Sequence, residues 1–140
     1  MNMATKLVAR DSAKAAADCT ALVVDNDELV RMGTVMMAQD LGFNIKSAPD
    51  GPSALVLIDG GKLPDLLITD YDMPGMTGVE LAKTITGHRP DVDVLIMTGH
   101  DVLDEHLPEE WKILHKPFTT ARLKEVLEAF GIQSGTPATL

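Results

Sequence analysis

Acids, an amide, a hydroxyl and an amine follow short apolar runs at four places in this sequence. They are Asp25-Asn26-Asp27, Asp70-Tyr71-Asp72, Thr98 and Lys116. Each residue alone has an ordinary structural interpretation, because an aspartate after a strand most often caps a helix or forms a turn. Asp27 is interpreted as such a cap. The repeated position of these groups after apolar runs instead predicts that they meet at one site.

Together these groups suit the chemistry of a phosphoryl group. Several carboxylates in one small cleft repel one another and raise one another's pKa unless a positive charge intervenes. Mg²⁺ supplies such a charge and takes hard oxygen ligands, usually one or two carboxylates with waters and a phosphate. Lys116 would add a second positive charge, and the Thr98 hydroxyl a hydrogen bond. Since a carboxylate is also a covalent acceptor, the sequence predicts phosphoryl transfer to an aspartate, which depends on positioning and charge neutralisation.

The elements that must position these groups alternate along the chain. Apolar runs typical of strands are followed by amphipathic stretches typical of helices, five times over. Expected strands span 21–25, 43–48, 64–70, 91–99 and 111–117, and expected helices span 27–43, 50–61, 77–88 and 119–131, with 100–108 a short helix or a loop. This order predicts one α/β domain, a doubly wound (βα)5 parallel sheet with helices on both faces. In such sheets the functional site lies beyond the carboxyl ends of the strands.

Composition narrows the classes of protein. The chain has 140 residues, 45% of them hydrophobic and 24% charged, which is typical of one globular domain. A net charge of -9 argues against nucleic acid as a partner, because phosphate backbones are bound by clustered Lys and Arg. Cys19 is the only cysteine, so no internal disulfide is expected. No apolar run approaches the ~18 residues that span a bilayer, and the expected location is the cytoplasm.

The order of the motifs resembles the receiver domain of the response-regulator family of two-component signalling. The resemblance covers about 20–130 and rests on "LVVDND", "PDLLITDYDMPGMTG", "LIMTG" and "HKPF". It implies a flavodoxin-like strand order, 2-1-3-4-5. It also implies that Asp70 accepts a phosphoryl group from a histidine of a sensor kinase or phosphotransfer protein. The chain would then be a phosphoacceptor that assists its own phosphorylation and dephosphorylation, rather than a turnover enzyme.

The same resemblance assigns the other site residues. The Mg²⁺ ligands would be Asp25, Asn26, Asp70 and the backbone carbonyl of Asp72. Thr98 and Lys116 would be drawn to the phosphoryl oxygens, while the side chains of Asp72 and His100 would influence how fast the phosphate is lost. An unidentified downstream protein would read the phosphorylated state, and the chain would be a monomer or a weak dimer.

Asn26 departs from the family pattern. The family usually places a metal-binding acid there, so one negative charge is missing. A charge pair a few ångströms apart is worth about 4 kcal/mol at an effective dielectric near 20, and competing water removes most of that. We therefore expect a weakened Mg²⁺ site. An alternative is a pseudo-receiver that binds a protein partner without phosphorylation.

Two more departures affect the last part of the domain. The family commonly has an aromatic residue at the position of Ile113, while Trp111, two residues earlier, is interpreted as a core residue. Only 17 residues separate Thr98 from Lys116, and Pro108 lies among them. A shortened fourth helix, a single turn or irregular, is predicted because proline ends a helix early.

The sequence also predicts where the domain begins and ends, and it argues against two other classes of protein. Residues 1–19 are expected to form a flexible arm, 20–130 the receiver domain and 131–140 a flexible tail, with no DNA-binding output module. A haloacid-dehalogenase-type phosphatase with Asp25 as nucleophile would leave "DYDMPGMTG" unexplained and lacks an evident cap domain. A flavin binder of the same topology would need a Gly/Ser/Thr-rich phosphate loop where "DNDELV" is acidic.

Overall fold

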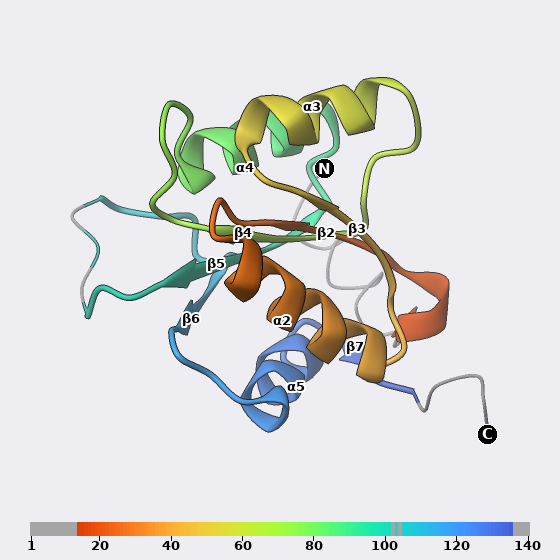
Figure 1. Cartoon of the computed structure of the whole chain (residues 1–140). Helices are drawn as coiled ribbons and strands as arrows, with labels where there is room; N and C mark the ends of the chain where they lie inside the picture. Colours follow the sequence, from red (N-terminus) through yellow and green to blue (C-terminus); the bar gives the residue numbers. More distant parts are fainter. Residues whose placement is uncertain (1–13, 102, 104, 136–140) are drawn as a thin grey trace.

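Five parallel strands form the central sheet of the computed structural model, which describes residues 14–101, 103 and 105–135. The strands are β2 (Thr20–Val24), β3 (Asn44–Ala48), β4 (Leu66–Asp70), β5 (Asp93–Thr98) and β6 (Lys112–His115). Their order in the sheet is β3-β2-β4-β5-β6 (Figure 1). Counted along the chain this is 2-1-3-4-5, so the predicted fold class and strand order are confirmed.

Helices cover both faces of the sheet. The helices α2 (Glu28–Asp40) and α5 (Thr120–Glu128) lie on one face, and α3 (Gly51–Asp59) and α4 (Gly78–His88) lie on the other (Figure 1). Every residue of β4 and β5 is buried, as expected for strands covered on both sides. Because side chains alternate along a strand, neighbours divide between two cores: Ile68 packs toward α2 and α5, and Leu67 toward α3 and α4.

Each of these four helices begins at a polar cap that the sequence supplies. The caps are Asp27, Asp50, Thr77 and Thr119, whose side chains accept hydrogen bonds from backbone N–H groups in the first turn. Thr77 and Glu80 form a reciprocal capping box. These bonds satisfy donors that a helix start otherwise leaves unpaired. The interpretation of Asp27 as a cap is therefore right.

The connection from β5 to β6 is the irregular alternative that the sequence left open. The described residues between 99 and 111 form bends and a turn and no helix. The Trp111 N–H donates to the Pro108 carbonyl at 3.1 Å, which closes a turn directly before β6. A short connection that contains a proline leaves too little chain for a full helix. The predicted shortening therefore goes as far as no helix at all among the described residues of this connection.

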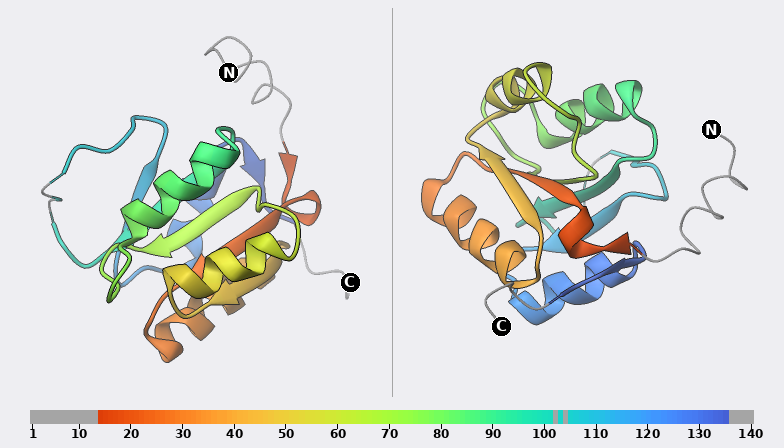
Figure 2. Two further views of the ribbon diagram at one scale, coloured as in Figure 1. Left: turned by 90° about the horizontal axis from the view of Figure 1, so that it is seen from above. Right: turned by 90° about the vertical axis from the view of Figure 1, so that its right-hand side faces the viewer.

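Short strands at both ends make the packed domain wider than the predicted 20–130. β1 (Lys14–Ala15) pairs in parallel with β7 (Ile132–Gln133), and η1 (Ala16–Asp18) leads into β2. Ala16 and Ile132 are buried in the core that α5 covers. The expected flexible ends are thus corrected for 14–19 and 131–135, and 1–13 and 136–140 lie outside the described residues. Figure 2 shows both short strands beside α5 at one end of the sheet.

The described helices are too short, and not apolar enough, for any of them to cross a lipid bilayer.

Gly78 allows α4 to start against the end of β4. A Cβ at residue 78 would lie 2.0 Å from the carbonyl oxygen of Asp70, whereas one at Gly87, in the same helix, would meet nothing within 4 Å. We expect Gly78→Ala to lower the free energy of unfolding by about 2 kcal/mol or more, since overpacking against rigid backbone costs about 1–3 kcal/mol. Gly87→Ala should raise it by about 0.5–1 kcal/mol, because alanine loses less backbone entropy in a helix. Urea denaturation of both variants measures the difference, and similar effects would contradict the close approach.

Candidate functional site

Four strand ends bring the chemistry-bearing side chains of the sequence to one rim of the sheet. Asp70 ends β4 and Thr98 ends β5, while Asp25 directly follows β2 and Lys116 directly follows β6. The parallel register aligns these ends, with Asp70 opposite Met97 and Thr98 opposite His115. Residues far apart in the sequence thus meet at the carboxyl edge, where open α/β sheets place their ligands.

Lys116 joins the two innermost carboxylates. Its Nζ lies 3.0 Å from Oδ2 of Asp25 and 3.0 Å from Oδ1 of Asp70. The carboxylates are buried, with Asp25 fully inaccessible and Asp70 8% exposed. Because a buried charge is costly unless it is paired, the ammonium group allows both acids to remain at the end of the sheet. The three groups together carry a formal charge of about -1.

Backbone contacts fix Lys116 and Asp25 in this arrangement. The Lys116 N–H donates to the Thr98 carbonyl at 2.8 Å, which continues the β5–β6 pairing by one residue. The peptide bond from Lys116 to Pro117 is cis. Oδ1 of Asp25 accepts from the Asp27 N–H at 2.9 Å, and Arg31 donates to the Asp25 carbonyl at 2.8 Å. In the run Asp25-Asn26-Asp27, Asp25 is therefore the ion-pair partner of Lys116, Asn26 is an exposed amide and Asp27 is the cap of α2.

Burial and pairing change the protonation behaviour of the two central groups. Burial raises the pKa of Asp70 above its usual range, Lys116 opposes that rise, and the nearby Asp25 adds to it. Burial alone would lower the pKa of Lys116, but its hydrogen bonds and attraction to Asp25 and Asp70 outweigh that effect and raise it. Lys116 is therefore held as a cation, while Asp70 is a more basic carboxylate than an exposed aspartate.

The oxygen donors of this rim fit a hard divalent cation. The carboxylates of Asp25 and Asp70 lie together, and the amide of Asn26 is exposed next to Asp25. Among the described residues no group of three or more His, Cys, Asp and Glu side chains has the geometry of a metal site. The predicted set needs only two carboxylates, because Mg²⁺ usually completes its shell with waters and a phosphate. The rim's net negative charge favours a cation, and the magnesium site stays a prediction.

A chain of polar contacts lies over the rim. Thr98 is buried, and its hydroxyl oxygen accepts from the His100 N–H at 3.0 Å. The His100 ring forms a hydrogen bond through Nε2 with the exposed carboxylate of Asp72. Tyr71 meets that ring edge-on, with centroids 6.1 Å apart, and its hydroxyl donates to Glu105 at 2.9 Å. Tyr71 and Asp72, the two residues that follow Asp70, are thereby tied to the segment that follows β5.

Sequence reasoning missed part of this contact chain. The resemblance gives the side chains of Asp72 and His100 only an influence on phosphate loss, and it gives Tyr71 and Glu105 no role. Tyr71 is the only tyrosine and sits between two acids, a signal for a polar contact but not for its partner 34 residues away. Trp111 packs in the core on the α3 and α4 side, as interpreted from the sequence.

Comparisons with known proteins identify the family of this domain. Residues 21–128 match the family described as response regulator receiver domain. The chemotaxis protein CheY of Pseudomonas aeruginosa is 33% identical over 114 residues, which cover 76% of this chain and 91% of that protein. The sensor kinase CckA of Brucella abortus is 33% identical over 119 residues, 78% of this chain but only 12% of the kinase.

Solved structures give the same result. A structure of Vibrio cholerae chemotaxis protein CheY4 matches with a TM-score of 0.68 at 26% identity, covering 80% of this chain and 98% of that one. The receiver domain of the hybrid histidine kinase CckA matches with a TM-score of 0.67 at 26% identity, covering 79% and 97%.

The pairing of Lys116 with Asp70 predicts a pH effect. In Lys116→Met we expect the pKa of Asp70 to rise further, because the group that opposes the effect of burial is gone. A carboxyl with a raised folded pKa binds its proton more tightly when folded, so stability falls as pH rises from about 3.9, the ordinary value for aspartate, to the folded pKa. That window should extend to higher pH in the variant.

Carboxyl ¹³C NMR titration of Asp70 measures this pKa directly. Lys112→Met is the matched control, because the Lys112 ammonium lies 5.4 Å from the centre of the Phe130 ring and not at the rim. An unchanged Asp70 titration in Lys116→Met would contradict the coupling.

Proposed function

The chain belongs to the response regulator receiver family, and on that basis we propose that it relays a signal by accepting a phosphoryl group on Asp70. The donor is a phosphohistidine of a sensor kinase or a histidine phosphotransfer protein. The observation that carries the proposal is the bridge from Lys116 to Asp25 and Asp70, at 3.0 Å each. It keeps a nucleophilic carboxylate, a second acid and a fixed cation within one phosphoryl group's reach.

The transfer exchanges one bond to phosphorus for another. A carboxylate oxygen of Asp70 forms the new P–O bond while the P–N bond of the phosphohistidine breaks, and the electron pair of that bond returns to the imidazole nitrogen. The ammonium group of Lys116 already contacts Asp70, and it stabilises the negative charge on the oxygens of the incoming phosphoryl group. Attack of water on phosphorus later releases inorganic phosphate and restores the carboxylate.

Thr98 can respond to the phosphoryl group without losing its present contact. Its hydroxyl oxygen already accepts from the His100 N–H, and a hydroxyl has one donor in addition to its acceptor sites. Donation from Thr98 to a phosphoryl oxygen would therefore pull on the segment that begins at His100. That segment continues to Glu105, which Tyr71 holds. We propose this route as the output of phosphorylation.

Magnesium would supply the positive charge that two acids and a phosphoryl group together require. Asp25, Asn26, Asp70 and the Asp72 carbonyl are the proposed ligands. Asp25 is positioned for this role by its bond to the Asp27 N–H. Asn26 contributes an oxygen without a charge, so the proposed site is weaker than one with an acid there.

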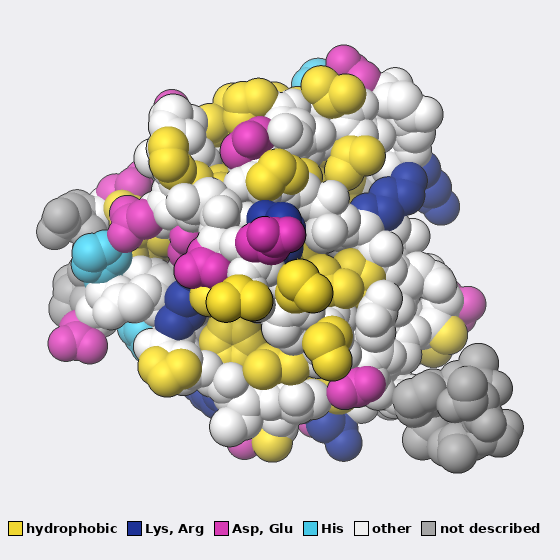
Figure 3. Space-filling view, viewed as in Figure 1, with side chains coloured by type: hydrophobic (Ala, Val, Ile, Leu, Met, Phe, Trp, Pro, Cys, Tyr) yellow, Lys and Arg dark blue, Asp and Glu magenta, His cyan; other side chains and the backbone are white. Residues whose placement is uncertain are grey.

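The face next to Lys116 suits the approach of a histidine-bearing partner. Apolar side chains of α2 are exposed there, with Leu29 81%, Met32 53% and Met36 62% accessible. Figure 3 shows hydrophobic side chains gathered over α2 on this face. A cavity of about 220 Å³ lies between α2 and the connection from β6 to α5. It is lined in part by Val30, Met37 and Lys116. We propose that the partner docks on this apolar surface, in the cytoplasm, and delivers its phosphoryl group to Asp70.

Acetyl phosphate tests the acceptor role without a kinase. After incubation with Mg²⁺, intact mass measurement should show one phosphoryl adduct on the chain. The adduct should be absent without Mg²⁺ and in Asp70→Asn, whose amide is not nucleophilic. Asp27→Asn is the matched control and should still react, because Asp27 caps α2. An adduct that persists in Asp70→Asn would disprove the assignment of the acceptor.

Asn26→Asp tests the metal assignment. The added charge should tighten Mg²⁺ binding about tenfold, or about 1.4 kcal/mol, because water screens most of the direct attraction. Isothermal titration calorimetry measures the affinity, and Gln39→Glu, an exposed position on α2, adds the same charge away from the rim. Equal affinities in both variants would remove Asn26 from the ligand set. An adduct that forms only in Asn26→Asp would instead support the phosphorylation-independent binding module.

A further inference from the structure

One end of the sheet lacks the helix that would cover it. β6 follows β5 without a helix among the described residues between them, and it is the last strand of the sheet. Leu114 is 1% exposed on the side that α5 covers, whereas Ile113, on the opposite side, is 38% exposed. An aliphatic side chain left accessible on a sheet face indicates a surface that something else can cover.

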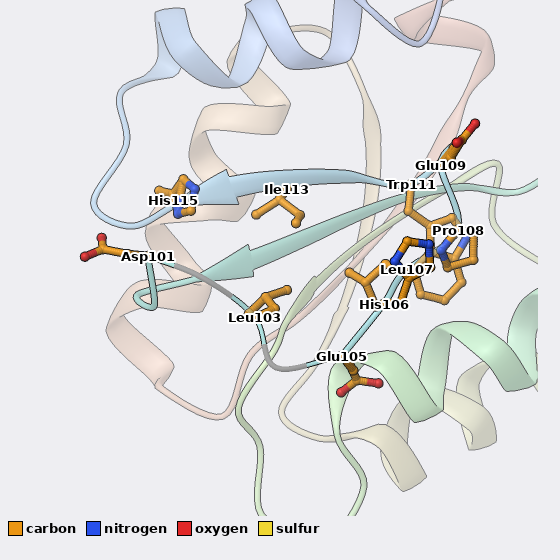
Figure 4. Close-up of a pocket in the computed structure, with 10 residues that line it drawn as sticks. All are labelled: Asp101, Leu103, Glu105, His106, Leu107, Pro108, Glu109, Trp111, Ile113 and His115. Atoms are coloured by element: carbon orange, nitrogen blue, oxygen red, sulfur yellow. The ribbon is translucent and has the colours of Figure 1, made fainter.

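A groove of about 420 Å³ lies over this uncovered end. Its lining residues come from β6 and from the segment between β5 and β6 (Figure 4). The apolar residues that line it include Leu107, Trp111 and Ile113. The polar ones are Asp101, Glu105, Glu109, His106 and His115. All three acids are exposed. The groove thus combines an apolar floor with a negative rim.

We propose that this groove binds a basic amphipathic helix of a partner protein, in the place where the chain lacks its own helix. A helix presents apolar side chains at i, i+3 or i+4, and i+7, over about 10 Å of its length. β6, four residues long, extends about 13 Å, so the two lengths match. Basic side chains flanking the apolar stripe would then meet the acids of the rim.

Charge selects this occupant over a second copy of the chain. The whole protein carries a formal charge of -9, so another copy would bring like charge to an acidic rim. Of the three acids that line the groove, Glu105 is held in place, because the Tyr71 hydroxyl donates to it at 2.9 Å. Binding to the groove requires no chemistry at Asp70 and is tested on the unphosphorylated protein, so its failure would leave the proposed phosphoryl transfer untouched.

A displayed library of 14-residue peptides tests the proposal on the full chain. The library fixes helical apolar spacing and leaves the remaining positions free to be acidic, basic or neutral. Selected peptides should carry a net positive charge, and the strongest should change the fluorescence of Trp111, the only tryptophan, in a saturable way. Neutral or acidic selected peptides, or binding that leaves Trp111 fluorescence unchanged, would overturn the proposal.

Matched variants locate the binding surface. Ile113→Lys should weaken the selected peptide at least about tenfold, and Leu57→Lys, an apolar site on α3 of similar exposure (40% against 38%), should not. Asp101→Asn with Glu109→Gln should weaken it about two- to fivefold, as expected for rim charges, whereas Asp59→Asn with Glu128→Gln removes the same charge elsewhere with little effect. Equal losses within either pair would show non-specific attraction to an acidic protein and overturn the proposal. The proposal would also be overturned if the protein formed concentration-dependent dimers that the peptide dissociates, because a second copy of the chain would then be the occupant of the groove.

Discussion

The ion pair that Lys116 makes with two buried carboxylates is the constraint on which the rest of the structure depends. Asp25 and Asp70 sit at the ends of adjacent strands, β2 and β4, where their charges repel. The compensating ammonium group comes from beyond β6, two strands further along the sheet. It reaches the acids only if the strand order and register are correct, so a polar contact at the rim reports on the assembly of the whole sheet.

The sequence predicts this rim well because parallel sheets leave little freedom. Five apolar runs followed by helical patterns define the α/β class, and the polar residues after each run must then share one edge. Asp27 was distinguished from Asp25 because a cap has a known place relative to its helix. The loss of the helix after β5 was foreseen only in part, since length and Pro108 show that a helix is shortened but not how far.

Other features escape prediction because they depend on contacts without a local pattern. β1 and β7 have two residues each, too few to show a strand period. Ala16, directly after β1, and Ile132, in β7, are buried in the same core. The hydrogen bond from Tyr71 to Glu105 joins two loops whose conformations are set by the sheet. The acids beside Tyr71 indicate a polar contact, but no local pattern identifies Glu105 as its partner. Long-range contacts between irregular segments are the part of a fold that composition and periodicity do not encode.

The pairing of β1 with β7 has a consequence for how this domain can be joined to other chains. Lys14 lies beside Ile132, and Lys14 also approaches Asp65, the residue before β4, to 4.0 Å. This corner is therefore at the amino end of the strands, opposite the rim that holds Asp70. Because the two strands are parallel, linkers attached before Lys14 and after Gln133 would leave the pair in opposite directions, from points close together and away from Asp70. Such a geometry suits circular permutation or insertion into a larger protein, because neighbouring ends tolerate both.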